Sequence, residues 1–139
     1  MSAVTTTRLH VNIPVTEIEP SLPFWEAVGF TVTDSVPVDG PDGSGPLGFA
    51  IVSNGSHHFM LQSVASIEGD LEIFGGKDLT ASPVLLYLTV EDIDAVANAL
   101  ADYPVVLPRR DTFYGATEIG YFAPDGTQVT FAQFNTQDT

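Results

Sequence analysis

The chain has 139 residues, enough for one domain, since a chain of about 150 residues buries about 68–70 % of its unfolded surface on folding. Four basic and 18 acidic residues give a net charge of −14, which argues against nucleic acid and anionic membranes as partners because both need a basic footprint. There is no cysteine, so disulfides and thiolate chemistry are excluded. No charged segment precedes an apolar signal-like run, and we expect a soluble, cytoplasmic protein.

The first half of the chain contains four strand-like segments, and one helix is expected among them. Pro20 and Pro23 suit the first turn of a helix of about ten residues, and Gly29 suits the position after its end. Asn54-Gly55 predicts a tight hairpin turn. Residues 39–46 form a flexible loop rich in glycine and proline. The expected strands are Leu9–Val15, Phe30–Val36, Leu47–Ser53 and His58–Val64.

The second half repeats this order after a linker over residues 65–82, whose apolar residues suggest that it packs against the protein. A helix is expected from about Glu91 to Asp102, with Thr89 and Asp92 at the spacing of a capping box. Asp125 and Gly126 turn the last hairpin. The expected strands are Val84–Val90, Val105–Arg109, Ala116–Ala123 and Thr127–Phe134.

The order of elements is therefore β-α-β-β-β twice, which indicates an internal duplication. One domain would span residues 1–139, with repeat one at about 8–64 and repeat two at about 83–135. The expected fold class is α+β, in which the two βαβββ repeats form a curved sheet around a shared cleft.

Three segments resemble the vicinal oxygen chelate superfamily of glyoxalases, bleomycin resistance proteins and extradiol dioxygenases. They are Leu22–Phe30 (LPFWEAVGF), Tyr114-Gly115 and Ala123–Phe131 (APDGTQVTF). Phe24-Trp25, the Tyr114-Gly115 region and the acidic charge are most similar to the bleomycin-resistance branch. The resemblance implies the glyoxalase/bleomycin resistance fold and a homodimer, because the clefts of this family are commonly completed by a second chain.

The superfamily's enzymes place metal ligands at four strand positions that face the cleft. Carried over to this sequence, these positions fall on His10, on Gln62 (or Met60 in a register shifted by two), on Leu85 and on Thr130. Divalent transition-metal ions prefer imidazole and carboxylate donors, and a leucine offers no donor atom. We therefore expect no metal, no cofactor and no catalytic residue.

Strand alternation gives a half-apolar ligand wall, which suits an amphipathic guest. Tyr114 could present an aromatic face to a ligand, and Glu118 could face the ligand or pair across the sheet. Arg109 and Arg110 are interpreted as structural ion-pair partners of carboxylates such as Asp111. The expected ligand-binding residues are His10, Asn12, Met60, Gln62, Leu85, Tyr87, Tyr114, Glu118, Thr130 and Ala132.

Three functions are compatible with these observations. The first is a metal-free protein that sequesters an amphipathic or cationic organic compound such as an antibiotic. The second is a metal-dependent lyase, isomerase or dioxygenase that uses His10, His58 and Glu118 as substitute ligands. Without such a role, the adjacent pair His57 and His58 is interpreted as two solvent-exposed side chains beside a hairpin turn. The third is a binding subunit that contacts a partner through residues 39–46 and 65–82. The net charge fits simple solubility, and also attraction of a cationic ligand.

Overall fold

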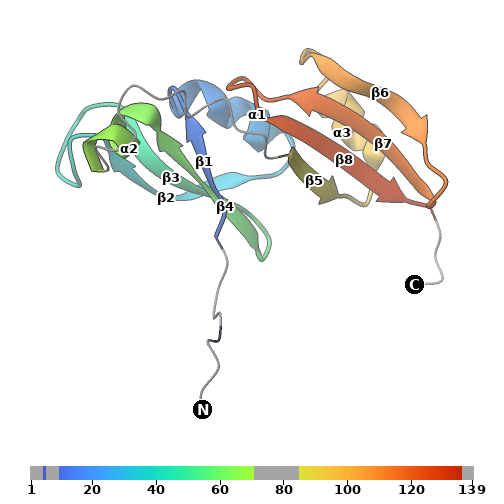
Figure 1. The fold of residues 1–139 in the computed structure, drawn as a ribbon, viewed down its shortest axis with the longest axis horizontal. Coiled ribbons are helices and arrows are strands. Elements are labelled where there is room, and N and C mark those ends of the chain that lie inside the picture. Colours follow the sequence, from blue (N-terminus) through green and yellow to red (C-terminus); the bar gives the residue numbers. More distant parts are fainter. Residues whose placement is uncertain (1–4, 6–9, 71–84, 136–139) are drawn as a thin grey trace.

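Two four-stranded sheets with the same internal order form the protein, and a computed structural model describes residue 5 and residues 10–70 and 85–135 of it. In each sheet the first strand is parallel to the fourth, and the remaining neighbours are antiparallel. The first sheet has the order β1-β4-β3-β2 and the second β5-β8-β7-β6. The expected duplication and the α+β fold class are confirmed, with each repeat building a sheet of its own (Figure 1).

Strand bounds agree with the sequence pattern to within a few residues. Gly55 and Gly126 turn the two final hairpins with positive φ angles of 64° and 92°, the left-handed region that glycine tolerates. The first sheet comprises β1 (Asn12–Val15), β2 (Thr31–Pro37), β3 (Leu47–Asn54) and β4 (His57–Ser63). The second comprises β5 (Leu85–Thr89), β6 (Val105–Asp111), β7 (Ala116–Phe122) and β8 (Gln128–Phe134).

The first helix is shorter than expected and is preceded by a tighter turn. A 3-10 turn, η1 (Glu19–Ser21), leads into α1 (Leu22–Ala27), and each has a proline near its start, where the missing N–H is not needed. Gly29 follows the C-cap with a φ of 98°, as expected. A Cβ at Gly29 would lie 2.8 Å from Nδ2 of Asn54.

Two sequence-based expectations for the other helices were wrong in detail. The second main helix, α3 (Ile93–Ala99), does not begin at Glu91 through a Thr89 capping box; Asp92 is its N-cap and accepts from the backbone N–H groups of residues 94 and 95. A single aspartate is sufficient because its carboxylate satisfies two otherwise unpaired donors. The start of the expected linker is a helix, α2 (Val64–Asp70), with Ile67 buried. The rest of that linker lies outside the described residues.

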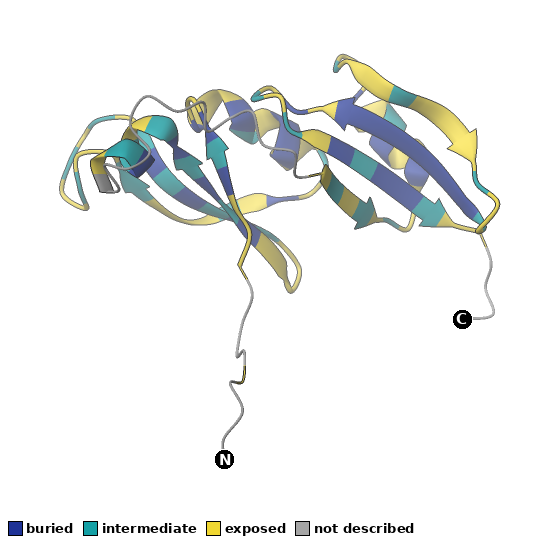
Figure 2. Cartoon of the chain, in the orientation of Figure 1, coloured by how far each residue is buried: buried dark blue, intermediate teal, exposed yellow. Residues whose placement is uncertain are grey.

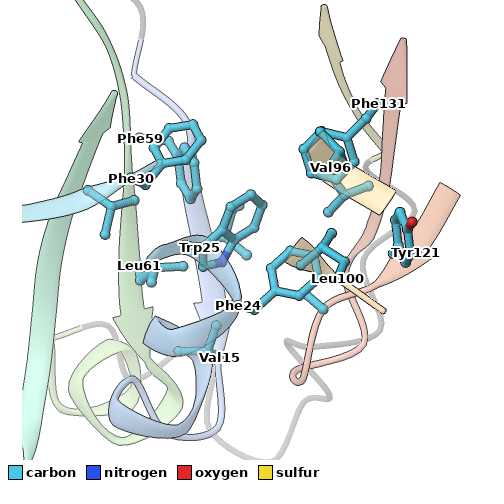
Figure 3. Close-up of a cluster of buried hydrophobic side chains, with 14 of the residues drawn as sticks. Val15, Phe24, Trp25, Phe30, Phe59, Leu61, Val96, Leu100, Tyr121 and Phe131 are labelled. Atoms are coloured by element: carbon cyan, nitrogen blue, oxygen red, sulfur yellow. The ribbon is translucent and has the colours of Figure 1, made fainter. Parts of the chain in front are cut away.

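One hydrophobic core joins the two repeats. Phe24 and Trp25 of α1 lie between side chains of the first sheet, such as Phe59, and side chains of the second repeat, such as Leu100 (Figure 3). The Trp25 ring meets the Phe59 ring edge-on at 4.7 Å, and the Phe24 ring meets that of Tyr103 at 5.0 Å. Figure 2 shows buried residues along most of β7 and at intervals along β8.

Candidate functional site

Each sheet has a second face that points away from the shared core. Strand alternation places Asn12, Met60 and Gln62 on this face of the first sheet, which we call the first open face. It places Tyr87, Glu118, Thr130 and Ala132 on the corresponding second open face. The ligand-wall residues expected from sequence thus divide into two groups, one on each sheet.

The first open face carries a row of neutral polar contacts. Asn12 donates from Nδ2 to Oε1 of Gln62 at 2.8 Å, and Gln62 donates from Nε2 to Oγ of Ser66 at 3.0 Å. At the start of β1 the exposed rings of His10 and His58 lie 5.4 Å apart between centroids. Amide and imidazole groups of this kind can accept and donate hydrogen bonds without adding a fixed charge.

The second open face is organised around the carboxylate of Glu118. Tyr87 donates from its hydroxyl to Oε2 at 2.5 Å, and Tyr114 donates to the same oxygen at 2.6 Å. Arg110 donates from Nε to Oε1 at 3.0 Å and places Nη2 at 3.0 Å from that oxygen. Glu118 is only 1 % exposed, so a buried carboxylate receives four donors at its two oxygens.

The strand register explains why these four residues meet. Arg110 of β6 is the direct partner of Glu118 on β7, and Glu118 is in turn opposite Ala132 on β8. Tyr87 lies one strand further away, on β5 opposite Thr130. Its side chain must cross β8 to reach Glu118, and the small side chain of Ala132, which is fully buried, leaves room for it.

Hydrogen bonding decides the protonation of this cluster. Burial alone would raise the pKa of Glu118, but hydrogen bonds from Tyr114, Tyr87 and Arg110 outweigh it and hold that pKa below its ordinary value. Burial and the hydrogen bond to Glu118 raise the pKa of Tyr87. At neutral pH the cluster therefore contains an ionised Glu118 whose charge is compensated by Arg110, beside a neutral Tyr87.

Three of the expected site residues, Tyr87, Tyr114 and Glu118, are brought into direct contact. Leu85, Thr130 and Ala132 lie on the same face, while His10, Asn12, Met60 and Gln62 lie on the first sheet. The sequence interpretation missed Arg110 as a member of the cluster. Arg110 is paired with Glu118 across β6 and β7. This pairing could not be inferred from simple strand alternation, because a bulge between residues 107 and 110 shifts the register of the two strands.

Both arginines form ion pairs, as the sequence suggested, but not with Asp111. Arg109 donates from Nη1 to Oδ1 of Asp94 at 2.7 Å on the protein surface. Asp111 instead accepts a hydrogen bond from the hydroxyl of Thr117 at 2.7 Å. An exposed pair such as Arg109 with Asp94 stabilises a protein only slightly.

A groove of about 1080 Å³ also lies between the two repeats, at the junction of α1, the β3–β4 turn, β5 and α3. Its walls include Phe30, His58, Leu88 and Phe131. Of the ten expected ligand residues only Tyr87 lines it. The groove is therefore a neighbour of the second open face and not the cleft expected from strand alternation.

The four positions that the sequence resemblance matches to metal ligands offer few donors to a metal ion. They are His10, Gln62 (or Met60), Leu85 and Thr130, and both atoms of the Gln62 amide are in hydrogen bonds to protein groups. Within the described residues, no group of three or more histidines, aspartates or glutamates is placed to hold a metal ion. His10 and His58 are neighbours, but Glu118 belongs to the other sheet and is bound by Arg110.

Solved structures with the same fold include proteins of several descriptions. A glyoxalase/bleomycin resistance protein/dioxygenase from Nocardioides has a TM-score of 0.72 and 14 % identity, covering 99 % of this chain and 89 % of the other. A hypothetical protein, SA1046 of S. aureus, has a TM-score of 0.71 and 18 % identity, with 94 % and 95 % covered. The bleomycin resistance determinant encoded on transposon Tn5 has a TM-score of 0.63 and 18 % identity, with 94 % and 100 % covered.

At these identities the solved structures establish a shared fold. No curated protein sequence matches the chain. Within the described part of the chain, none of the helices has the length and apolar character that a membrane span requires. A family model matches residues 7–131, almost the whole chain, and the protein therefore belongs to the Glyoxalase/Bleomycin resistance protein/Dioxygenase superfamily.

Proposed function

We propose that this protein binds a small amphipathic organic molecule and does so without a metal ion. The observation that supports the proposal is the chemistry at the four positions that the resemblance matches to metal ligands, where an aliphatic chain, a hydroxyl and a hydrogen-bonded amide stand in place of the donors that a catalytic metal prefers. A fold that is kept while these positions offer few metal donors favours a protein that encloses its ligand over one that polarises it.

The proposed ligand surface combines apolar contact with a few fixed hydrogen-bonding groups. Leu85 and Tyr87 are 66 % and 50 % exposed on the second open face, and Thr130 adds a hydroxyl between them and β7. The first open face contributes amide and imidazole groups. Small-molecule sites are mostly apolar with a small number of polar groups that fix orientation, and the two open faces together have that composition.

A homodimer is part of the proposal because the two open faces belong to separate sheets of one chain. A second copy could set its first open face against the second open face of its partner and so enclose a ligand between them. Two-fold pairing is the commonest assembly of soluble proteins. The ten residues predicted from the sequence, from His10 to Ala132, are proposed as the ligand wall in that assembly.

The biological role that we propose is sequestration of a toxic compound such as an antibiotic. The net charge of −14 would speed the capture of a cationic compound by long-range attraction. The proposal includes a cytoplasmic location, where such a compound would meet its target. The structural likeness to a bleomycin resistance determinant supports the choice of first ligands to test.

Isothermal titration calorimetry tests this function directly. Purified protein is titrated with bleomycin-type glycopeptides and with other cationic aromatic antibiotics, with and without added salt. The proposal predicts saturable heat with at least one of these compounds at a ratio of one ligand per site. An absence of heat across the panel would contradict the resistance role.

A second candidate function is a metal-dependent enzyme, favoured by the contact between the His10 and His58 rings at 5.4 Å. Two imidazoles are a partial ligand set, and among the described residues no further histidine, aspartate or glutamate completes it. Elemental analysis of protein purified without chelator separates the two candidates. One tightly held transition metal per chain would support the enzyme, and its absence would support the binding protein.

A further inference from the structure

The two tyrosines of the second open face are oriented in the reverse of the usual way. A tyrosine at a protein surface normally buries its ring and leaves its hydroxyl in water. Tyr87 and Tyr114 instead direct their hydroxyls to the buried Oε2 of Glu118, at 2.5 and 2.6 Å, while the side chains stay 50 % and 45 % exposed. The structure thus fixes the polar ends and leaves ring surface available to a ligand.

The hydroxyls of Tyr87 and Tyr114 bind the same oxygen of Glu118 but approach it from different parts of the sheet. Tyr87 reaches Oε2 from β5, across β8, and Tyr114 reaches it from the loop before β7. Hydrogen bonds to an ionised group are stronger than those between neutral groups, so the two rings are held more firmly than exposed tyrosines usually are. A ring fixed before binding loses little conformational entropy when a ligand contacts it.

Glu118 has no capacity left for a direct contact with a charged ligand. Its two oxygens accept four donors, and Arg110 compensates its charge at 3.0 Å. Arg110 itself is half exposed, with 54 % of its side chain open to solvent. A cationic group at this point would meet the arginine before it could reach the carboxylate.

We propose that Glu118 is a positioning residue, and that the tyrosine pair it holds forms a subsite for a flat aromatic ring system that binds by contact with the exposed faces of Tyr87 and Tyr114. This inference rests on the proposed binding function and names the chemical class of the ligand group. Neighbouring apolar side chains extend the surface, since the rings of Phe113 and Phe134 lie 5.1 and 6.3 Å from that of Tyr114. Stacking on an aromatic side chain is open to any flat ring, because each such ring has a π-face.

A fluorescence titration with two flat probes tests the subsite, using 9-aminoacridine as the cationic ring and acridone as the neutral one. Titrations are done at about 1 M salt, where a screening length of about 3 Å removes most of the attraction due to net charge. Both probes should bind the wild-type protein. Tyr87→Ala and Tyr114→Ala should each weaken binding by about tenfold or more, while Tyr103→Phe, in the core, should change it little.

The role of Glu118 requires a readout that a merely structural residue would not affect. Glu118→Gln should weaken probe binding several-fold in the wild-type background. In the Tyr87→Phe/Tyr114→Phe background the same change should have no further effect, because these rings are no longer tethered to residue 118. A full effect of Glu118→Gln in that background would overturn the positioning role, since residue 118 would then act on the ligand directly.

Two further outcomes would overturn the subsite. If the wild-type protein binds the probes and both alanine variants bind them equally well, the rings do not contact the ligand, although the binding function itself stands. If Tyr87→Ala instead converts a dimer to a monomer in size-exclusion chromatography at the titration concentration, the rings form a contact between subunits. Far-UV circular dichroism and Trp25 fluorescence confirm that each variant is folded before it is titrated.

Discussion

The two repeats share a topology but differ in the chemistry of their open faces. On the first face, Asn12, Gln62 and Ser66 form a row of neutral hydrogen bonds. On the second, an ionised Glu118 is surrounded by an arginine and two tyrosines. The core faces, in contrast, are apolar in both repeats. The two repeats thus share a scaffold, while their open faces differ.

The starts of the two main helices show the same divergence in a simpler setting. Asp92 caps α3 with its side chain, whereas Ser21 at the start of α1 makes no side-chain cap and is followed by a proline-containing first turn. Either arrangement satisfies the first turn of a helix, because proline needs no hydrogen-bond acceptor for its nitrogen. Equivalent positions in the two repeats therefore need not carry equivalent residues.

The largest effect on stability is expected from side chains in the core that joins the two repeats. Trp25→Ala should lower the free energy of unfolding by about 3–5 kcal/mol, and Leu100→Ala in the other repeat by about 2–5 kcal/mol. Both side chains are buried in one cluster, so each variant should unfold in a single transition measured by far-UV circular dichroism. Two separate transitions in either variant, with one unchanged from wild type, would show that the repeats are independent.

A smaller effect should distinguish the charged network from the neutral one. Glu118→Ala removes an acceptor with three charged or hydroxyl partners and should lower the free energy of unfolding by about 1.5–3 kcal/mol. Gln62→Ala on the first open face should cost about 0.5–1.5 kcal/mol, because its hydrogen bonds join neutral groups. Urea denaturation followed by Trp25 fluorescence measures both, and equal losses would contradict the contrast between the faces.

The residues at the starts of the two main helices should also contribute unequally to stability. Asp92→Ala should lower the free energy of unfolding by about 1 kcal/mol, since two backbone N–H groups lose their acceptor. Asp92→Asn keeps the accepting oxygen and serves as the conservative control. Ser21→Ala should cost less than half as much as Asp92→Ala, because Ser21 caps no N–H group. The same urea titration gives all three values.

The smallest effect concerns pH. In the folded state the pKa of Glu118 lies below its ordinary value, so its contribution is present above the unfolded pKa of about 4.3. That contribution should disappear as the pH falls through the folded value. The difference in unfolding free energy between wild type and Glu118→Gln should therefore shrink below about pH 4. A difference that stays constant from neutral to acid pH would contradict the ionised state of Glu118.

Tyr87 should act at the opposite end of the pH scale. Its pKa is raised, so its stabilising contribution is complete below the unfolded value of about 10 and is lost as the pH rises through the folded value. The difference in unfolding free energy between wild type and Tyr87→Phe should thus shrink only at strongly alkaline pH. Urea titrations at alkaline pH measure this difference.

Much of the scaffold could be predicted from sequence because it depends on local and repeated patterns. Alternation along β8 correctly separated Val129 and Phe131 from Thr130 and Ala132, and glycine positions located both hairpin turns. The helix bounds were less accurate. The cap at Asp92 and the helix at Val64–Asp70 depend on side-chain geometry and on packing, which the residue pattern alone does not determine.

The candidate site could be predicted only in part. Alternation placed Tyr87 on the expected ligand wall, but the sequence left open whether Glu118 faces a ligand or pairs across the sheet. In the structure the Glu118 carboxylate is bound by protein groups from β5, β6 and the loop before β7. That outcome depends on the shifted register of β6, which brings Arg110 opposite Glu118. It also depends on the reach of Tyr87 across β8, a contact between residues 31 positions apart in sequence. Long-range contacts of this kind follow from the assembled sheet.

Native mass spectrometry of protein purified without chelator and mixed with 9-aminoacridine gives the most direct test. The mass of each species reports the bound metal, the bound organic ligand and the number of chains together. We predict a species of two chains that carries the organic guest and no transition metal. A species that retains one transition-metal ion per chain and binds no organic ligand would contradict the proposal that this protein binds an organic molecule without a metal ion.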